Sequence, residues 1–347
     1  MALQALPCTP LGIKGKDGSK MELPMKKISE KKSGKQLKKN VAHGVYAVFR
    51  IVLLCAIGFV ILYPLLYMIV TSLRAKGSFM NSSKIWILDE TSFIQNYKIA
   101  LTALDYGTGF LNTLKYEILS AALEIAMCAV VAYGFSRFKF KLRGLLLAFL
   151  FLTILVPDNM IIIPRVINFS KLDFLGLFGL INKLTGVDLR ANLLDSGWCF
   201  YLPSLTATGL RSGLMIYIYM QFFKNLPAEL EEAAWIDGAG PVRTFCSIAL
   251  PSSGVVILTN TVFSLVWHWN DYFLASLYLS DDYPLAVSLT RITDNLKAIG
   301  YMPVSSSPET MAAMMAGAIL TILPILLVYM VLQRGFIKSI DRVGITG

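Results

Sequence analysis

Charged residues are scarce in this 347-residue sequence. Only 16% of the residues are Asp, Glu, Lys or Arg, whereas soluble domains contain about 25%. Hydrophobic residues make up 55% of the chain, and the mean hydropathy is +0.61. A soluble fold of this length could not bury so much apolar surface. The composition therefore excludes a soluble globular protein and predicts an integral membrane protein.

Histidine and cysteine are also rare. The histidines are His43 and His268. The five cysteines lie far apart, with no CxxC pair and no neighbouring histidine: Cys8, Cys55, Cys128, Cys199 and Cys246. Such spacing supports neither a metal site nor a disulfide framework. With so few histidines an acid–base enzyme is disfavoured as well, so we expect no catalytic residue and no bound metal.

The sequence contains no phosphate-binding loop of the form GxxxxGK[ST], in which backbone amides and a lysine neutralise phosphates. The nearest glycine-rich stretch, residues 12–19, does not end in Gly-Lys-Ser or Gly-Lys-Thr. We therefore expect no cofactor on this chain.

Positive charge is concentrated at the N-terminus. The formal net charge is +10, and residues 1–44 carry ten lysines and few large apolar residues. We expect these residues to form a disordered cytoplasmic tail. Such a tail can attract anionic lipid headgroups, by roughly 1 kcal/mol per cation near the surface. A solvated extension that only marks orientation is the favoured interpretation, and the charge is no indication of nucleic acid.

Six apolar runs follow in residues 45–347. About 20 helical residues, at a rise of 1.5 Å each, cross a hydrocarbon core of about 30 Å. We predict an all-α integral membrane protein whose six transmembrane helices cover 51–73, 110–135, 145–164, 198–223, 244–270 and 310–333. Pro157 and Asp158 interrupt the third run, and Pro324 predicts a kink in the sixth. The first run begins near Val45 and is too long for a cleavable signal peptide.

The distribution of Lys and Arg predicts the orientation of these helices. With the N-terminus inside, 19 cations fall on cytoplasmic segments and ten on the longer outer loops. Cytoplasmic loops of membrane proteins carry such an excess. We therefore expect both termini, and the loop between the fourth and fifth helices, to lie in the cytoplasm.

This loop, residues 225–251, predicts a short helix, a glycine break and a second short helix. Pro227 suits a first helical turn. Gly238 permits a turn, and Pro241 opens the next segment. Acidic residues lie at the positive end of the first helix dipole: Glu229, Glu231 and Glu232. A docking element and an ordinary interfacial loop both fit this pattern.

The same loop resembles the EAA signature of ABC importer permeases. After Glu232-Ala233-Ala234 come three further residues and then Gly238, and after nine more residues comes Ile248-x-Leu250-Pro251. Further motifs are similar to the carbohydrate-uptake branch, which includes the maltose permease subunits: Gln221-Phe222-Phe223, Leu226-Pro227, Trp269-Asn270-Asp271-Tyr272 and Gln333-Arg334-Gly335-Phe336-Ile337. The resemblance covers residues 45–347, although the outer loop 165–197 is longer than usual.

In that family the EAA loop is a coupling helix that sits in a cleft of a cytoplasmic ATPase. The resemblance therefore implies that coupling to the ATPase involves Glu232, Ala233, Ala234, Trp235, Ile236, Asp237 and Gly238. The alanines allow close approach of two backbones, Glu232 can pair with a basic group, and Trp235 is an apolar anchor of the kind that dominates interfaces. The implied partners are a second permease subunit, an ABC ATPase dimer, an extracellular solute-binding protein and the lipid bilayer of a bacterial cell.

Ionisable and polar groups inside the predicted spans are candidates for the solute path, because such groups are costly in lipid. Among the groups in or next to these spans, the residues assigned to the solute path are Glu124, Arg211, Trp269, Asn270 and Asp271. Glu124 lies 13 residues before Arg137, and Arg211 lies 13 residues before Lys224. Both are thus about 20 Å above the cytoplasmic border at helical rise. Equal depth predicts a Glu124–Arg211 ion pair, with a structural clamp favoured over solute contact.

The aromatic cluster at residues 267–272 has two interpretations. Indole faces can pack on sugar rings, but aromatic belts are also common at helix ends. The belt is favoured for Trp267 and Tyr272, and the pore or a partner subunit for Asn270 and Asp271. His268 is expected to be a satisfied interface side chain rather than a proton relay.

The sequence as a whole predicts a permease subunit of an ATP-driven importer, with a sugar or oligosaccharide as solute. A peptide or a polyol phosphate is the alternative solute class. Two other classes of protein are less favoured. An ion-gradient transporter would take up solute without an ATPase, and a receptor or scaffold would transport nothing.

Overall fold

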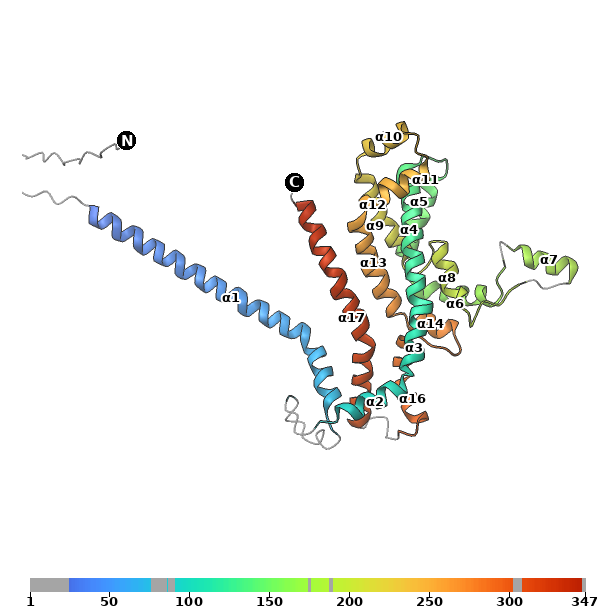
Figure 1. Cartoon of the computed structure of the whole chain (residues 1–347), viewed down its shortest axis with the longest axis horizontal. Coiled ribbons are helices and arrows are strands. Elements are labelled where there is room, and N and C mark those ends of the chain that lie inside the picture. The colour runs from blue at the N-terminus through green and yellow to red at the C-terminus, as the bar shows by residue number, and fades with distance from the viewer. Residues whose placement is uncertain are drawn as a thin grey trace, which may run out of the picture. The chain divides into compact units, whose positions relative to one another are not determined.

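The computed structural model describes residues 25–75, 86, 91–173, 176–186, 190–301 and 308–344. In these ranges the chain is helical and has no strand, as predicted (Figure 1). The β-type pairing found there consists of isolated bridges, Arg74 with Thr91 and Leu172 with Ala191. The chain divides into two compact units, Met1–Pro64 and Leu65–Gly347.

The first unit contains most of helix α1, Met25–Leu73, which includes Pro64. Residues 1–24 of the predicted tail lie outside the described residues. From Met25 onward the chain is helical, whereas the sequence predicted disorder up to residue 44. Lys, Glu and Gln in residues 25–44 are good helix formers. The adjoining apolar helix also removes the cost of starting a new one.

The second unit is built from helices joined by short connections. In chain order they are α2 (Phe93–Ala103), α3 (Tyr106–Asn112), η2 (Thr113–Ile118), α4 (Leu119–Arg137), α5 (Arg143–Leu155), α6 (Asp158–Ser170), α7 (Leu177–Thr185), α8 (Trp198–Leu205), α9 (Ser212–Asn225), α10 (Ala228–Ile236), α11 (Pro241–Thr244), η3 (Phe245–Ala249), α12 (Leu250–Ser252), α13 (Gly254–Trp269), α14 (Phe273–Tyr278), α15 (Leu285–Thr290), α16 (Ile292–Ala298) and α17 (Pro308–Gly344). The segments η2 and η3 are π-helical.

Three described helices are long and apolar enough to cross a membrane: His43–Leu73, Tyr106–Arg137 and Thr310–Gly335. Two bent pairs raise this number to five if each pair is one span. They are Arg143–Leu155 with Met160–Ser170, bent by 108°, and Pro241–Ser252 with Gly254–Trp269, bent by 79°. The described chain is therefore an all-helical membrane protein with at least three spans, and the break predicted at Pro157 is present.

The predicted fourth span, 198–223, is not one continuous helix. It consists of α8 and α9, which are separated by residues 206–211. Ala207 and Arg211 have left-handed backbones in this break, with φ of 53° and 59°. Hydrogen bonds pair part of this backbone: the Thr206 hydroxyl donates to the Leu202 carbonyl, and the Thr208 amide donates to the Pro203 carbonyl. Irregular backbone at membrane depth requires such pairing.

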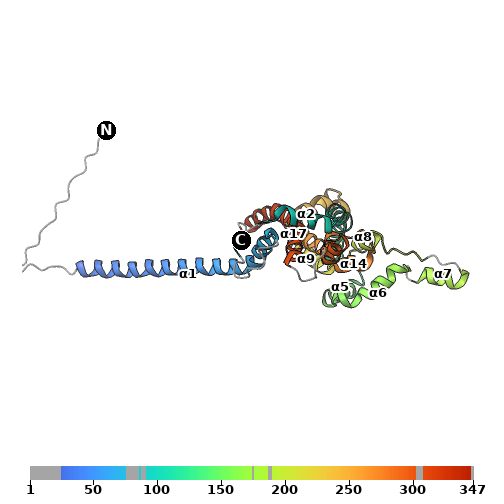
Figure 2. The ribbon, with the colours of Figure 1, turned by 90° about the horizontal axis from the view of Figure 1, so that it is seen from below.

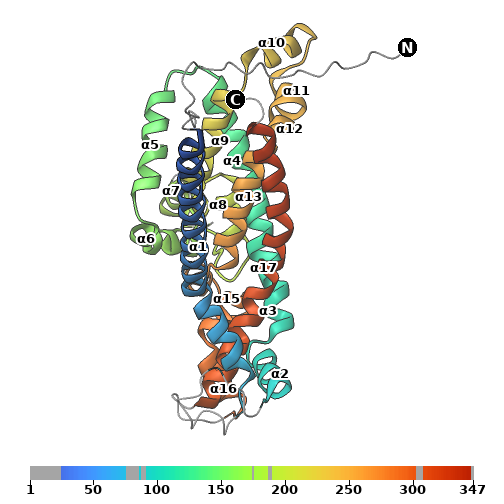
Figure 3. The same ribbon diagram turned by 90° about the vertical axis from the view of Figure 1, so that its left-hand side faces the viewer.

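Helix α4 is the central element of the second unit. It packs against α8, α9 and α13, and α13 packs against α17. The helices α4, α9 and α13 run side by side, with α10 and α11 at one end and α2 and α16 at the other (Figures 1 and 3). Seen from below, α5 and α6 lie on one side of this bundle (Figure 2).

Small residues allow the close approach of α4 and α9. Cys128, Ala129 and Ala132 are buried in α4, and they meet large side chains of α9 such as Tyr219 and Phe223. Interfaces between membrane helices favour such small residues because no hydrophobic force draws helices together in lipid. The α4–α9 contact therefore depends on the volume of these α4 side chains.

Ala132→Leu is expected to destabilise this contact. Ala132 is fully buried, so the additional carbons must displace their neighbours, and overpacking of this kind costs about 1–3 kcal/mol. The thermal-unfolding midpoint of the protein in detergent should fall. Val130→Leu, on the exposed side of the same helix, is the matched control, and an equal fall in both variants would contradict the packing described here.

Candidate functional site

The loop between α9 and α13 folds as the sequence predicts. Helix α10 has Glu229 and Glu231 in its first turn, and Pro227 directly precedes it. Gly238 has φ +79°, a left-handed conformation that glycine adopts without strain. Pro241 is the first residue of α11. The predicted order of helix, glycine turn and second helix is confirmed.

A buried ion pair attaches α10 to the end of α4. The Glu231 carboxylate is buried, and its Oε1 accepts a hydrogen bond from Arg137 Nε at 3.0 Å. Arg137 Nη2 also donates to the Leu226 carbonyl at 2.7 Å. Such charge-assisted hydrogen bonds are shorter and stronger than neutral ones. Glu231 was not among the predicted coupling residues, although it lies three residues before Ala234 and so shares its helix face.

The opposite face of α10 points outward. Of the predicted coupling residues, Ala234 is buried and the others are exposed: Glu232, Ala233, Trp235, Ile236, Asp237 and Gly238. Ile236 is 87% exposed and Trp235 is 49% exposed. The loop therefore presents two large apolar side chains beside acidic groups. The other face of the same helix is attached to α4 through the Glu231–Arg137 pair.

The second half of the loop rests on the bundle. Ala249 is fully buried, and the partly buried side chains of Phe245 and Leu250 pack on the core between α4 and α9. The Phe245 ring lies 5.0 Å from that of Tyr133 in α4. These contacts fix the second half of the loop to α4 and α9.

The predicted Glu124–Arg211 ion pair is wrong. Glu124 Oε2 faces His268 Nε2 at 2.7 Å, and Glu124 Oε1 accepts a hydrogen bond from the Ser212 hydroxyl. The Arg211 guanidinium instead lies over the Trp267 ring, 5.0 Å from its centroid. Glu124 and Arg211 do lie at a similar depth, because Glu124 contacts Ser212, the residue that follows Arg211. The left-handed backbone of Arg211 directs its side chain elsewhere.

A buried cluster of two carboxylates and one imidazole joins three spans. His268 Nδ1 lies 3.2 Å from Glu117 Oε2, and its Nε2 contacts Glu124. All three side chains are buried. The cluster therefore connects η2 and α4 with α13, and through Ser212 with α9. Each nitrogen–oxygen contact requires a bridging proton, so the cluster holds two protons between three groups.

Sequence reasoning missed Glu117 as a partner of His268. A usable signal existed, since Glu117 and Glu124 are seven residues apart and lie on one helix face. His268, expected to be a satisfied side chain, is satisfied by these carboxylates. In the described ranges no group of three or more His, Cys, Asp or Glu side chains could hold a metal ion.

The structure separates the predicted solute-path residues into two groups. Glu124 and Trp269 are buried, and Trp269 Nε1 donates to the Thr321 carbonyl of α17 at 3.0 Å. Arg211, Asn270 and Asp271 instead line one open cavity of about 260 Å³, together with Trp267. Asp271 Oδ1 accepts a hydrogen bond from the Leu274 amide at 3.0 Å.

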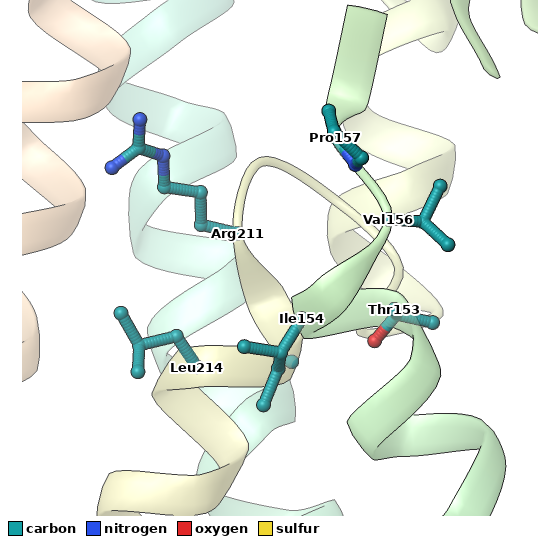
Figure 4. Close-up of a pocket in the computed structure, with 7 residues that line it drawn as sticks. Thr153, Ile154, Val156, Pro157, Arg211 and Leu214 are labelled. Carbon is teal, nitrogen blue, oxygen red and sulfur yellow. The ribbon is translucent and has the colours of Figure 1, made fainter. Parts of the chain in front are cut away.

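Arg211 also borders a second cavity, of about 400 Å³, between α5 and the start of α9. The cavity is lined by Thr153, Ile154, Val156, Pro157, Arg211, Gly213 and Leu214 (Figure 4). A Cβ atom on Gly213 would lie 2.6 Å from Thr153 Oγ1. A glycine at position 213 therefore lets the two helices meet closely beside this cavity without displacing the Thr153 side chain.

Comparison with known proteins gives one consistent result. Residues 125–342 match the family described as binding-protein-dependent transport system inner membrane component. Protein LplC of Bacillus subtilis is 28% identical over 300 residues, which cover 85% of this chain and 92% of LplC. The maltodextrin transport system permease protein MalD of Streptococcus pneumoniae is 25% identical over 296 residues, which cover 85% of this chain and 93% of MalD.

The fold is similar to that of a solved structure. A chain of a bacterial ABC transporter involved in the import of the acidic polysaccharide alginate matches with a TM-score of 0.63 and 21% sequence identity. The match covers 84% of this chain and 96% of that chain. At this identity the likeness concerns the fold alone.

Proposed function

We propose, from the premise that this chain belongs to the family of binding-protein-dependent transport system inner membrane components, that it forms half of the translocation path for a sugar or oligosaccharide. The chain is a permease subunit of an ABC importer and not an enzyme. A saccharide as solute is supported by the relative that is named for maltodextrin transport. ATP and Mg²⁺ bind, in this proposal, to a partner ATPase.

The proposed topology has six spans and cytoplasmic termini. It is supported by the three candidate spans and the two bent pairs, if each pair is one span. The α8–α9 pair would be the remaining span, and the excess of Lys and Arg on the inner segments supports the orientation. In this orientation α10 lies on the cytoplasmic side, and Arg211, Asn270 and Asp271 lie toward the outer side.

The exposed face of α10 is the proposed contact with the ATPase. The observation that carries this proposal is the ion pair between Glu231 and Arg137 behind an outward face that bears Trp235 and Ile236. Apolar anchors on a fixed helix are well suited to fill a cleft in a partner. Glu232 is available for a basic group of that partner, because it is exposed and its neighbour Glu231 makes the internal contact.

Two connections would transmit a movement of α10 to the spans. The Glu231–Arg137 pair connects it to α4, and Leu226 connects it to α9. When the ATPase subunits close on ATP, the α10 helices of this chain and of a second permease subunit approach each other. The bundle then changes from inward-facing to outward-facing, and an extracellular binding protein delivers the solute.

Reconstitution tests this function. The chain should copurify with a sister permease and an ABC ATPase, and in proteoliposomes the complex should take up a labelled saccharide only with ATP and its binding protein. Uptake that is driven by an ion gradient without ATPase would instead identify a secondary transporter. A receptor or scaffold would show no vectorial uptake under any of these conditions.

A further inference from the structure

We propose that the solute is an anionic saccharide, one that bears a carboxylate or a phosphate, and that Arg211 binds this anionic group. The inference rests on the proposed function and adds a solute class to it. Four observations support it: the backbone of Arg211, the cavities that it borders, the aromatic platform beside it and its depth in the bundle.

Arg211 occupies an unusual backbone position. Its φ of 59° is left-handed, directly before the first residue of α9. Glycine adopts this conformation freely, whereas an arginine there is strained. Backbone strain of this kind concentrates at functional sites. Figure 4 shows the consequence, since the side chain leaves the turn on the side away from Val156 and Pro157.

Two of the cavities that Arg211 borders lack a counter-charge, and a third contains the Asp271 carboxylate. The cavity in Figure 4 has no carboxylate among its lining residues. A neighbouring cavity of about 390 Å³ is bordered by Arg211 and by a second cation, Arg165, and again by no acidic residue. In the described part of the chain, the contact recorded for the Arg211 guanidinium is the Trp267 ring. The Asp271 carboxylate of the third cavity accepts a hydrogen bond from the Leu274 amide. A cation inside a membrane protein is costly, and a bound anion would stabilise it.

The neighbours of Arg211 fit a sugar acid. The Trp267 indole also stacks on the Phe263 ring, with ring centroids 5.4 Å apart and planes at 11°. A guanidinium that rests its face on an indole keeps its edge donors free, and these match the two oxygens of a carboxylate or phosphate. Asn270 and the Asp271 carboxylate line the same cavity and can bond ring hydroxyls.

The depth of Arg211 disfavours a lipid headgroup as the anion. Helix α9 has 14 residues, so Arg211 is about 21 Å from the far end of the helix at 1.5 Å per residue. The hydrocarbon core is about 30 Å thick. Arg211 therefore lies inside the core, where headgroup phosphates are not found, and a solute that passes through the bundle is the better source of the anion.

The test uses the complete importer in liposomes of phosphatidylcholine alone, so that no anionic lipid is present. Labelled trigalacturonate, glucose 6-phosphate and maltotriose are supplied separately. We expect ATP-dependent uptake of a charged probe, and its identity separates carboxylate from phosphate. Arg211→Gln should reduce that uptake about tenfold or more, because it removes a charge-assisted hydrogen-bond pair. Arg211→Lys keeps the positive charge but loses the paired donors of the guanidinium. Its uptake should therefore lie between that of the wild type and that of Arg211→Gln.

The controls separate selectivity from folding and from the proposed function. Lys98→Gln removes an exposed cation from α2 and should leave uptake unchanged. The Arg211→Gln complex should assemble as the wild type does, which copurification of its subunits would measure. Uptake of maltotriose alone, or full uptake of a charged probe by Arg211→Gln, would overturn the proposal and leave the importer function standing. Uptake of no probe at all would contradict the proposed saccharide function itself.

Discussion

Glu232→Lys is expected to uncouple ATP hydrolysis from uptake while leaving the protein folded. Glu232 is exposed on the outward face of α10. Surface substitutions usually change stability by less than about 0.5 kcal/mol, so the thermal-unfolding midpoint should not move. In the complex, a lysine placed against a basic group of the ATPase costs several kcal/mol. Uptake by the reconstituted importer should therefore fall at least about tenfold, since each 1.4 kcal/mol is a factor of ten.

Glu231, the residue before Glu232, is buried, and its substitution should affect stability instead of coupling. Glu231→Ala leaves the Arg137 guanidinium without its carboxylate at a site where the two side chains are 14% and 2% exposed. Removing one partner of a buried pair costs about 3 kcal/mol or more. This variant should lose thermal stability, whereas Glu232→Lys should lose only coupling. If both variants lower the unfolding midpoint equally, or if Glu232→Lys transports normally, the assignment of the outward face fails.

His268→Ala is expected to have the largest effect on stability. It leaves Glu117 and Glu124 buried, with oxygens that were 3.2 Å and 2.7 Å from the imidazole nitrogens now facing an empty space. Breaking a buried charged pair in this way costs about 3–5 kcal/mol. The purified protein should show a lower unfolding midpoint and a lower yield in the membrane.

A double-mutant cycle tests whether the carboxylates cause this loss. In a Glu117→Gln/Glu124→Gln background, removal of His268 should cost much less, because no unpaired charge remains. Additive effects of the substitutions would show that the three groups are not coupled. His43→Ala, at an exposed position of α1, is the matched control and should change stability by less than about 0.5 kcal/mol.

Local signals account for what the sequence predicted well. Pro227, Gly238 and Pro241 each restrict the backbone over one or two residues, so the helix, turn and helix of the α10–α11 loop could be derived without knowledge of the fold. The interruption at Pro157 followed for the same reason. The resemblance to importer permeases rested on the same loop, where spacing along the chain carries the information.

Tertiary contacts account for what the sequence did not predict. The apolar run over 198–223 continues through the α8–α9 break, and the chain at Gly209 comes so close to Glu124 that a Cβ there would lie 2.8 Å from its Oε1. Residue counting gave the depth of Arg211 but could not give its side-chain direction, which depends on a left-handed backbone. Glu117 and His268 are 151 positions apart, and only the packing of α13 on η2 and α4 brings them together.

Helix α9 has a mechanical consequence within the proposed function. It is a rod of 14 residues, with a non-helical turn before Ser212 and an extended backbone at Leu226 and Pro227. Such a rod acts as a lever: a tilt of about 10° over its length of about 21 Å moves one end by about 4 Å relative to the other. One end is attached to α10 and the other carries Arg211. The displacement of Arg211 for a given tilt therefore increases with the length of α9. Removal of one helical turn from α9 would reduce that displacement by about a quarter.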